Sequence, residues 1–180
     1  MKSPFSIIVA VDKDFGIGKD GGLPWNLPGD MKHFKEVTTL SEGKGLVNAV
    51  IMGRKTWQSI PEKFRPLPDR LNIILTRDAH FSLPSGVLKA SGLNEALHLL
   101  EESSLASKVG KVFVIGGAEI FKIAVGHSQC REIFLTHIRQ SFQCDRFFPS
   151  LPPSFKEASR SGPFVKDGPE YSFVTYRKQS

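Results

Sequence analysis

Short runs of β-branched and other apolar residues alternate with segments whose apolar residues recur every three or four positions. Short apolar runs bounded by polar residues are typical of strands buried on both faces, and the longer period is typical of helices that bury one face. The pattern predicts strands over 5–11, 49–52, 71–76, 87–90, 111–115 and 133–138, and helices over 30–40, 54–60, 93–106 and from 118 onwards.

This alternation of strands and helices favours an α/β fold with a mostly parallel, twisted central sheet flanked by helices. Residues 171–176 alternate weakly between apolar and polar, so we expect them to form an antiparallel strand at the C-terminal edge of that sheet. The stretch after Pro149 is expected to be rich in loops. At 180 residues and 40% hydrophobic content, the chain is long enough for one sizeable core, so we expect a single domain over 1–180.

Composition and charge narrow the function. A formal charge of +6 and a pI near 9.4 favour anionic partners, but the basic residues are scattered, which argues against a nucleic-acid-binding tail. Cys130 and Cys144 are too few for a disulfide framework, and the five histidines lack metal-ligand spacing, so no metal is expected. The apolar run 5–11 is too short for a signal peptide core or a membrane span, so we expect a cytoplasmic protein.

The most distinctive stretch, 16–38, joins the first strand to the first helix. Glycines and prolines around Trp25 indicate a long shaped loop, and loops of this length are usually functional. Asp30 shares a helix face with Phe34 and Thr38. An acid in the first turn of a helix is stabilised by the helix dipole and needs no further role. A carboxylate beside an aromatic ring and a tryptophan-bearing loop also suits a pocket for a flat ligand with N–H donors. Both interpretations remain open.

Three predicted strands end in residues suited to anions: Gly53-Arg54-Lys55-Thr56, Thr76-Arg77 and Gly116-Gly117. Each alone has an ordinary explanation, because surface cations are common and a lone glycine pair is not a full dinucleotide fingerprint. Mostly parallel sheets bind ligands beyond the carboxyl ends of their strands, so we expect the three to converge. The inferred ligand is a dinucleotide with an extra phosphate. Arg70, at the start of its strand, suits either an edge ion pair or bidentate capture of a ligand carboxylate.

Taken in order, these motifs closely resemble dihydrofolate reductases. The resemblance runs through nearly the whole chain and implies NADPH-dependent reduction of 7,8-dihydrofolate to 5,6,7,8-tetrahydrofolate by hydride transfer, supporting one-carbon metabolism and thymidylate synthesis. The resemblance also implies that antifolates inhibit the enzyme. Nothing in the sequence demands more than a monomer, and these residues hold no thymidylate synthase portion, so the fused bifunctional form is not supported. The matching motifs are Gly-Ile-Gly with Leu-Pro-Trp-Asn-Leu-Pro and Asp30, Ile-Met-Gly-Arg-Lys-Thr-Trp from Ile51, Arg-Pro-Leu-Pro-Asp-Arg from Arg65, Val-Ile-Gly-Gly from Val114, Leu-Thr-His-Ile from Leu135, and Asp145 ahead of Phe-Phe-Pro.

On the substrate side, the resemblance implies that Asp30 is the only ionisable group facing the pterin, where it hydrogen-bonds the ring amide and amino group. Thr136 would support that contact. The proton for the pterin N5 would come from a water near the mobile loop that holds Leu23 and Trp25. Arg70 would hold the α-carboxylate of the substrate's glutamate. The remaining substrate contacts implied are Ile8, Met31, Phe34, Ile60, Leu67, Ile115 and Phe121.

On the cofactor side, the resemblance implies that Ala10 and Ile17 touch the nicotinamide. Thr76 and Arg77 match the site of the adenosine 2′-phosphate, which favours NADPH over NADH. The family carries a cis peptide between its two matching glycines, and Phe121 stands where a tyrosine is often found. The other cofactor contacts implied are Gly53, Arg54, Lys55, Thr56, Gly116, Gly117, Ala118, Glu119 and Ile120.

Two competing functions remain at this stage. A sister reductase of the same fold, acting in riboflavin synthesis, is disfavoured because Asp30 and Arg70 together match a pterin and a glutamate tail. A nucleotide- or nucleic-acid-binding module would use the positive charge but leaves Trp25, Asp30 and Thr136 unexplained.

Overall fold

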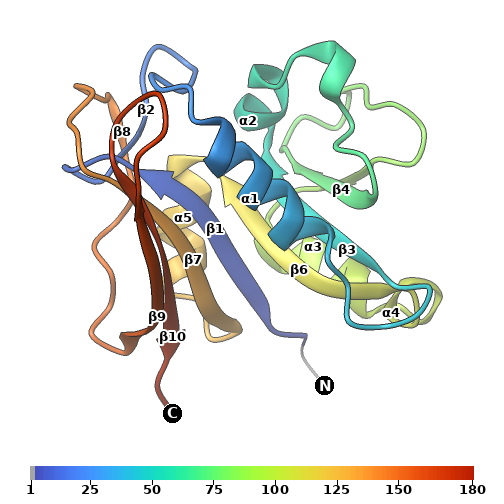
Figure 1. The fold of residues 1–180 in the computed structure, drawn as a ribbon. Helices are drawn as coiled ribbons and strands as arrows, with labels where there is room; N and C mark the ends of the chain where they lie inside the picture. Colours follow the sequence, from blue (N-terminus) through green and yellow to red (C-terminus); the bar gives the residue numbers. More distant parts are fainter. Residues whose placement is uncertain (1–2) are drawn as a thin grey trace.

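The computed structural model describes residues 3–180, apart from the side chain of Ser103. The strands of its central sheet are β1 (Phe5–Val11), β3 (Val47–Gly53), β4 (Arg70–Leu75), β5 (Leu88–Ala90), β6 (Val109–Gly116), β7 (Cys130–Ile138), β9 (Phe155–Phe164) and β10 (Tyr171–Lys178). They follow the order β5-β4-β3-β6-β1-β7-β10-β9 (Figure 1). Two short strands, β2 (Gly16–Gly18) and β8 (Arg146–Phe147), pair with each other in a separate sheet.

The predicted α/β class is confirmed. β1 pairs in parallel with β6 and β7, and β3 pairs in parallel with β4 and β6. β10 is antiparallel to β7, as expected for the C-terminal strand.

The prediction that this strand forms the edge is wrong, and so is the prediction that the stretch after Pro149 is mainly loop. β9 lies outside β10 and forms the edge of the sheet. Only Phe155 of β9 is buried, and the strand contains Lys, Glu, Arg, Gly and Pro, so no apolar alternation marks it. Its pairing with β10 makes it a strand, and its polar composition is typical of an edge.

The helices are α1 (Pro28–Thr39), α2 (Arg54–Ser59), α3 (Leu93–Glu101), α4 (Ser103–Ala106) and α5 (Ala118–Val125), with a 3-10 turn, η1, at Glu62–Phe64. The single helix predicted over 93–106 is two helices, because the backbone at Glu102 is extended. No helix in residues 3–180 is long and apolar enough to cross a membrane.

The sheet separates two apolar layers, with α1 across the front in Figure 1 and α3 and α5 behind. Behind it, Ala96 and Leu100 of α3 and Ala124 of α5 belong to the larger core cluster, with alternate residues of β1, β3, β4 and β6. The front layer is smaller and includes Ile8, Trp57 and the partly buried ring of Phe34. Several members of the front layer, such as Phe34, are only partly buried, so part of this apolar lining can face a ligand.

Candidate active site

The carboxylate of Asp30 is held in the protein interior near the carboxyl ends of β1 and β7. It lies in the first turn of α1, which begins at Pro28 and has no side-chain cap, and it is only 8% exposed. Thr136 on β7 donates a 2.6 Å hydrogen bond from Oγ1 to Asp30 Oδ1. Burial raises the pKa of Asp30, and the Thr136 hydrogen bond opposes this by lowering it. A buried, hydrogen-bonded acid favours the pocket interpretation over a solvated first-turn acid.

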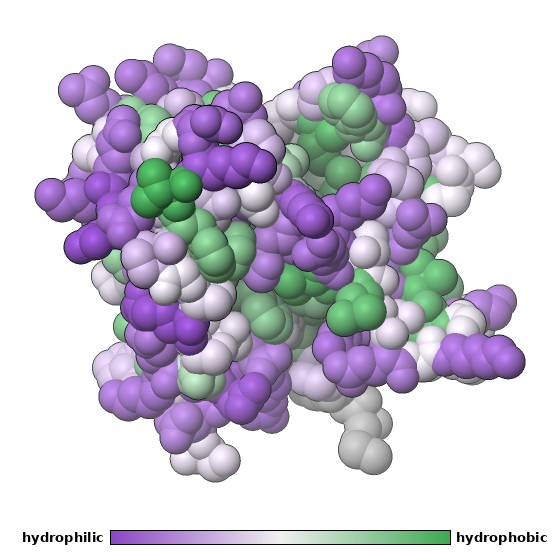
Figure 2. All heavy atoms as spheres, in the orientation of Figure 1, coloured by the Kyte–Doolittle hydropathy of each residue, from purple (hydrophilic) through white to green (hydrophobic). Residues whose placement is uncertain are grey.

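An apolar wall lies on the same side of the sheet. Five of the expected substrate contacts, from five different segments, meet in the front-layer cluster: Ile8, Phe34, Ile60, Leu67 and Ile115. In Figure 2, green apolar side chains are visible in a recess between α1 and the α2–η1 segment. Met31 follows Asp30 on α1 and is 54% exposed. Five of the sequence-predicted wall residues are thus brought together on the side of the sheet that α1, the helix with Asp30, covers.

Phe121 belongs to a different environment from the other wall residues. It is buried in the rear core layer, where its ring lies 5.2 Å from that of Phe148 between centroids. The ring reaches the carboxyl end of β6 at Gly116, where an added Cβ would lie 3.7 Å from Phe121 Cζ. Any contact with a ligand would therefore come from behind the glycine pair.

Arg70 is partly buried and pre-oriented. Its Nε donates to Pro68 O at 2.8 Å and its Nη1 donates to Thr38 Oγ1 at 2.9 Å, while the guanidinium lies 5.9 Å from the centroid of the Phe34 ring. Burial lowers the pKa of Arg70, and the charge of Asp69 opposes that shift. No carboxylate among residues 3–180 forms an ion pair with it. The edge ion pair is therefore not seen, and Nη2 keeps its donors for another group.

The three anion-suited strand ends converge, as predicted. Met52 is in register with Gly116 across β3 and β6, and Gly53 is in register with Leu75 across β3 and β4. The peptide between Gly116 and Gly117 is cis. A Cβ on Gly117 would lie 3.2 Å from Thr56 Oγ1, so the start of α2 packs closely against the glycine pair.

One of the cations at these strand ends, Arg54, lies beside an acid that sequence reasoning missed. Arg54 Nη1 lies 3.7 Å from Asp78 Oδ2, and the Arg54 guanidinium lies 5.6 Å from the centroid of the Phe81 ring. The Asp78 N–H donates to Thr76 Oγ1 at 3.1 Å. Lys55 and Arg77 are exposed. This set of cations, hydroxyls and a tight glycine pair fits the phosphates of a dinucleotide.

The remaining expected cofactor contacts flank this edge. Ala118, Glu119 and Ile120 form the first turn of α5 directly after the glycine pair. Glu119 is exposed and pairs with Lys122 at 3.1 Å, whereas Ile120 packs partly against the core. At the other side, Ala10 is in β1 and Ile17 is in β2, so both lie beside the loop that leads to α1.

That loop presents one exposed and one buried side chain. Leu23 is 56% exposed. Trp25 is buried, with its indole 5.4 Å from the Phe142 ring between centroids. Its Nε1 is buried without a hydrogen-bond partner in the described part of the chain. An unpaired buried donor is costly, so this N–H suits a water or a ligand at the site.

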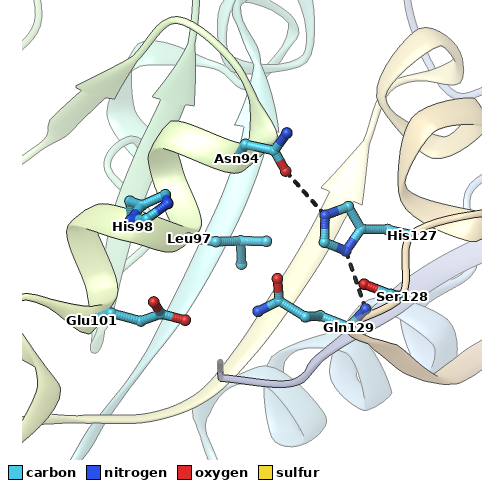
Figure 3. Close-up of a pocket in the computed structure, with 7 residues that line it drawn as sticks. All are labelled: Asn94, Leu97, His98, Glu101, His127, Ser128 and Gln129. Carbon is cyan, nitrogen blue, oxygen red and sulfur yellow. Dashed lines mark hydrogen bonds between the residues drawn. The ribbon is translucent and has the colours of Figure 1, made fainter. Parts of the chain in front are cut away.

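A polar cavity of about 250 Å³ lies away from these strand ends, beside the start of β7. It is lined by α3 and by the connection between α5 and β7 (Figure 3). Asn94 Oδ1 and His127 Nε2 are 3.0 Å apart, and the Gln129 N–H donates to His127 Nδ1 at 3.1 Å. These groups largely satisfy one another, and none of the expected site residues lines the cavity.

Matches to known proteins extend over nearly the whole chain. A family model described as dihydrofolate reductase matches residues 4–178. The chain is 40% identical over 180 residues to the dihydrofolate reductase of Aedes albopictus, covering 97% of each. It is 43% identical over 179 residues to the bifunctional dihydrofolate reductase-thymidylate synthase of Glycine max, covering 98% of this chain and 34% of that protein.

The chain thus spans about a third of the length of the bifunctional plant relatives it matches, which include proteins of Arabidopsis thaliana and Zea mays. Among solved structures, Schistosoma mansoni dihydrofolate reductase matches with a TM-score of 0.87 at 38% identity, covering 99% of this chain and 100% of that one. Reduction of dihydrofolate with a nicotinamide cofactor is the known activity of this family. From its motifs, its fold and these matches, the chain belongs to the dihydrofolate reductase family.

Proposed function

We propose that this chain reduces 7,8-dihydrofolate to 5,6,7,8-tetrahydrofolate by hydride transfer from NADPH, and so supports one-carbon metabolism and thymidylate synthesis. The observation that carries the proposal is the buried Asp30–Thr136 pair, set beside an apolar wall at the carboxyl edge of the sheet. This arrangement supplies one acceptor group for a flat heterocycle and little else that is polar.

Asp30 binds and orients the pterin. One carboxylate oxygen, Oδ1, accepts from Thr136, which leaves Oδ2 to accept from the ring amide and amino group. Trp25 contributes its unpaired indole N–H, which suits a water that delivers a proton to N5. Leu23, two residues before Trp25 in the same loop, is exposed and would limit access of other water once a substrate is bound.

Arg70 holds the other end of the substrate. Its Nε and Nη1 are fixed by Pro68 and Thr38, so the guanidinium is oriented before a ligand arrives. The remaining donors suit the α-carboxylate of the glutamate tail. Pre-orientation lowers the entropy lost on binding.

NADPH supplies the hydride when it is bound. Arg54, Lys55 and Thr56 would hold its phosphates with the backbone at Gly117. Thr76 and Arg77 would bind the 2′-phosphate and thereby favour NADPH over NADH. Ala10 and Ile17 would orient the nicotinamide against the pterin.

The direct test follows loss of the nicotinamide absorbance when purified protein is mixed with NADPH and dihydrofolate, with a control that lacks folate. Folate-dependent oxidation supports the proposal. Absence of oxidation in a folded protein that still binds NADPH would contradict it, and would favour the sister reductase of riboflavin synthesis.

We also propose that the chain acts as a monomer in the cytoplasm and that antifolates compete with dihydrofolate at Asp30. Flat inhibitors with N–H donors match the free oxygen of that carboxylate. Sedimentation velocity measures the oligomeric state, and inhibition that is not competitive with dihydrofolate would contradict the shared site.

A further inference from the structure

Asp12, directly after β1, is a second buried carboxylate, and it lies outside the substrate pocket. It is 1% exposed. Its Oδ1 accepts hydrogen bonds from the backbone N–H groups of Asp14 at 2.9 Å and Gly16 at 2.7 Å. Its Oδ2 accepts from the N–H of Phe142 at 2.9 Å and from the thiol of Cys144 at 3.5 Å. One carboxylate therefore joins two segments that are about 130 residues apart in the chain.

These four donors keep the group ionised. Burial raises the pKa of Asp12, but the hydrogen bonds from Phe142, Gly16, Asp14 and Cys144 outweigh it and leave the pKa below its ordinary value. A buried carboxylate is tolerated only where hydrogen bonds replace water. Loss of the charge would therefore affect both segments at once.

One of the two segments reaches the proposed reaction site through packing. The ring of Phe142 meets the indole of Trp25 edge to face, at an interplanar angle of 66°. Cys144 and Ala10 pack against the same cluster as Trp25. The position of the unpaired Trp25 N–H thus depends on where the Phe142 segment is held.

The other segment is the start of the loop that carries Trp25. Gly16 pairs with Phe147 between β2 and β8, and an added Cβ on Gly16 would overlap Cys144. Farther along, the Asp145 N–H donates to Gly18 O at 2.9 Å. The Asp12 carboxylate lies at the inner end of this contact between the loop and residues 142–147.

We propose that Asp12 is a positioning residue for hydride transfer, whose carboxylate clamps the Gly16 and Phe142 segments together and so sets the position of Trp25. The part that concerns the reaction rests on the proposed function. The clamp itself, meaning the hydrogen bonds from the two segments to Asp12, is a property of the fold and can be measured without catalytic activity.

The first test is Asp12→Asn, with Asp14→Asn as the matched control. The amide keeps one acceptor oxygen but turns its NH₂ group toward donors on one side of the clamp. Asp14→Asn removes the same charge from an exposed carboxylate that, within residues 3–180, accepts a side-chain hydrogen bond from Ser141 Oγ alone, at 2.6 Å. In single turnovers with NADPH already bound, Asp12→Asn is expected to slow hydride transfer about tenfold or more, as for loss of hydrogen bonds to a buried charge. The affinity for NADPH should stay within about twofold of the wild-type value, a change well below the tenfold effect expected on hydride transfer.

A wild-type rate in Asp12→Asn, or an equal loss in Asp14→Asn, would overturn the proposal. A third variant guards against misfolding of Asp12→Asn. Phe142→Leu keeps the backbone N–H that bonds Asp12 but removes the ring that contacts Trp25. It should slow hydride transfer to a similar extent, and an unchanged rate would break the proposed link between Asp12 and Trp25.

The second test does not depend on activity. Burial raises the pKa of the Cys144 thiol, and the charge and hydrogen bond of Asp12 raise it further. Asp12→Asn should therefore make Cys144 react several times faster with an aromatic disulfide, while Asp14→Asn and Phe142→Leu should not. An unchanged rate in Asp12→Asn would exclude the clamp. If the wild-type protein does not reduce dihydrofolate, the proposed function is refuted. The clamp is not, because the reaction rate of Cys144 still tests it.

Discussion

The hydroxyl of Thr136 on β7 donates a 2.6 Å hydrogen bond to Oδ1 of Asp30 on α1, across 106 residues of sequence. This bond attaches the first turn of α1 to the sheet. It also occupies one oxygen of the carboxylate and leaves the other free for a ligand. Because the bond favours the ionised form while burial opposes it, Thr136 adjusts the protonation of the proposed substrate anchor.

Asp30→Asn should keep the fold and NADPH affinity but lower turnover at pH 7 by about 100-fold or more, because the pterin loses the charged anchor that positions it for proton transfer from water. Steady-state kinetics and NADPH titration measure both. Near-normal turnover would remove the role assigned to Asp30.

The same variant should also change the pH dependence of stability. The folded-state pKa of Asp30 is raised, so its stabilising contribution is complete below the unfolded pKa and is lost as pH rises through the folded pKa. Asn does not titrate. Relative to wild type, Asp30→Asn should gain melting temperature as pH rises through this window, by about 2–4 °C per kcal/mol. A difference that does not change with pH would contradict the raised pKa.

Thr136→Val removes the hydroxyl and keeps the side-chain shape. Loss of a hydrogen bond to a charged group costs about 1.5–3 kcal/mol, so kcat/KM for dihydrofolate should fall about tenfold or more. The pKa of Asp30 should rise, because the bond that lowers it is gone. The pH profile of kcat/KM measures this shift. Thr39→Val, at the end of α1, is the control and should behave as wild type.

Arg77→Ala should weaken NADPH more than NADH, by about tenfold, since a charge-assisted bond to the 2′-phosphate is lost. Asp78→Asn should act in the opposite direction by removing a negative charge beside Arg54 and Thr76. Titrations of both cofactors measure the ratio. Arg131→Ala, at the far end of β7, controls for net charge. Equal losses of NADPH and NADH in Arg77→Ala would refute the 2′-phosphate contact.

Only one thiol of the folded protein should react readily. Burial raises the pKa of Cys130 to about 12, so its thiolate fraction at pH 8 is about one in ten thousand. Cys144 is half-buried and should react first. Mass spectrometry after brief treatment with an aromatic disulfide distinguishes the two. Early modification of Cys130 would show that β7 opens in the native state.

Whether a helix or strand could be predicted from the sequence depends on which interactions stabilise it. Strands β1, β3, β4 and β6, and the second half of β7, are largely buried, so their sequences are mostly apolar runs that can be read directly. β9 is held mainly by backbone bonds to β10 and buries only Phe155, so its own side chains carry no signal. Glu102 divides a predicted helix through backbone geometry that apolar periodicity does not record.

The residues of the site also divide into those that the sequence revealed and those that it did not. Asp30, Arg70 and the glycine pair could be found because their residue types are unusual where they occur. Asp78 and Asp12 were missed because an acid after a strand is ordinary in sequence. What makes these two acids distinctive is their partners: Arg54 for Asp78, and the Phe142 segment for Asp12.

By itself, the sequence determined the α/β class, the positions of the buried strands along the chain and the chemical groups available for a flat substrate and a phosphorylated cofactor. These depend on local periodicity and residue type. Only the tertiary structure decided that β9 is the edge, that Thr136 bonds Asp30 and that Asp12 joins two distant segments. Such contacts form between residues about 100 or more positions apart or through backbone pairing, and no local pattern encodes which partner a buried polar group will find.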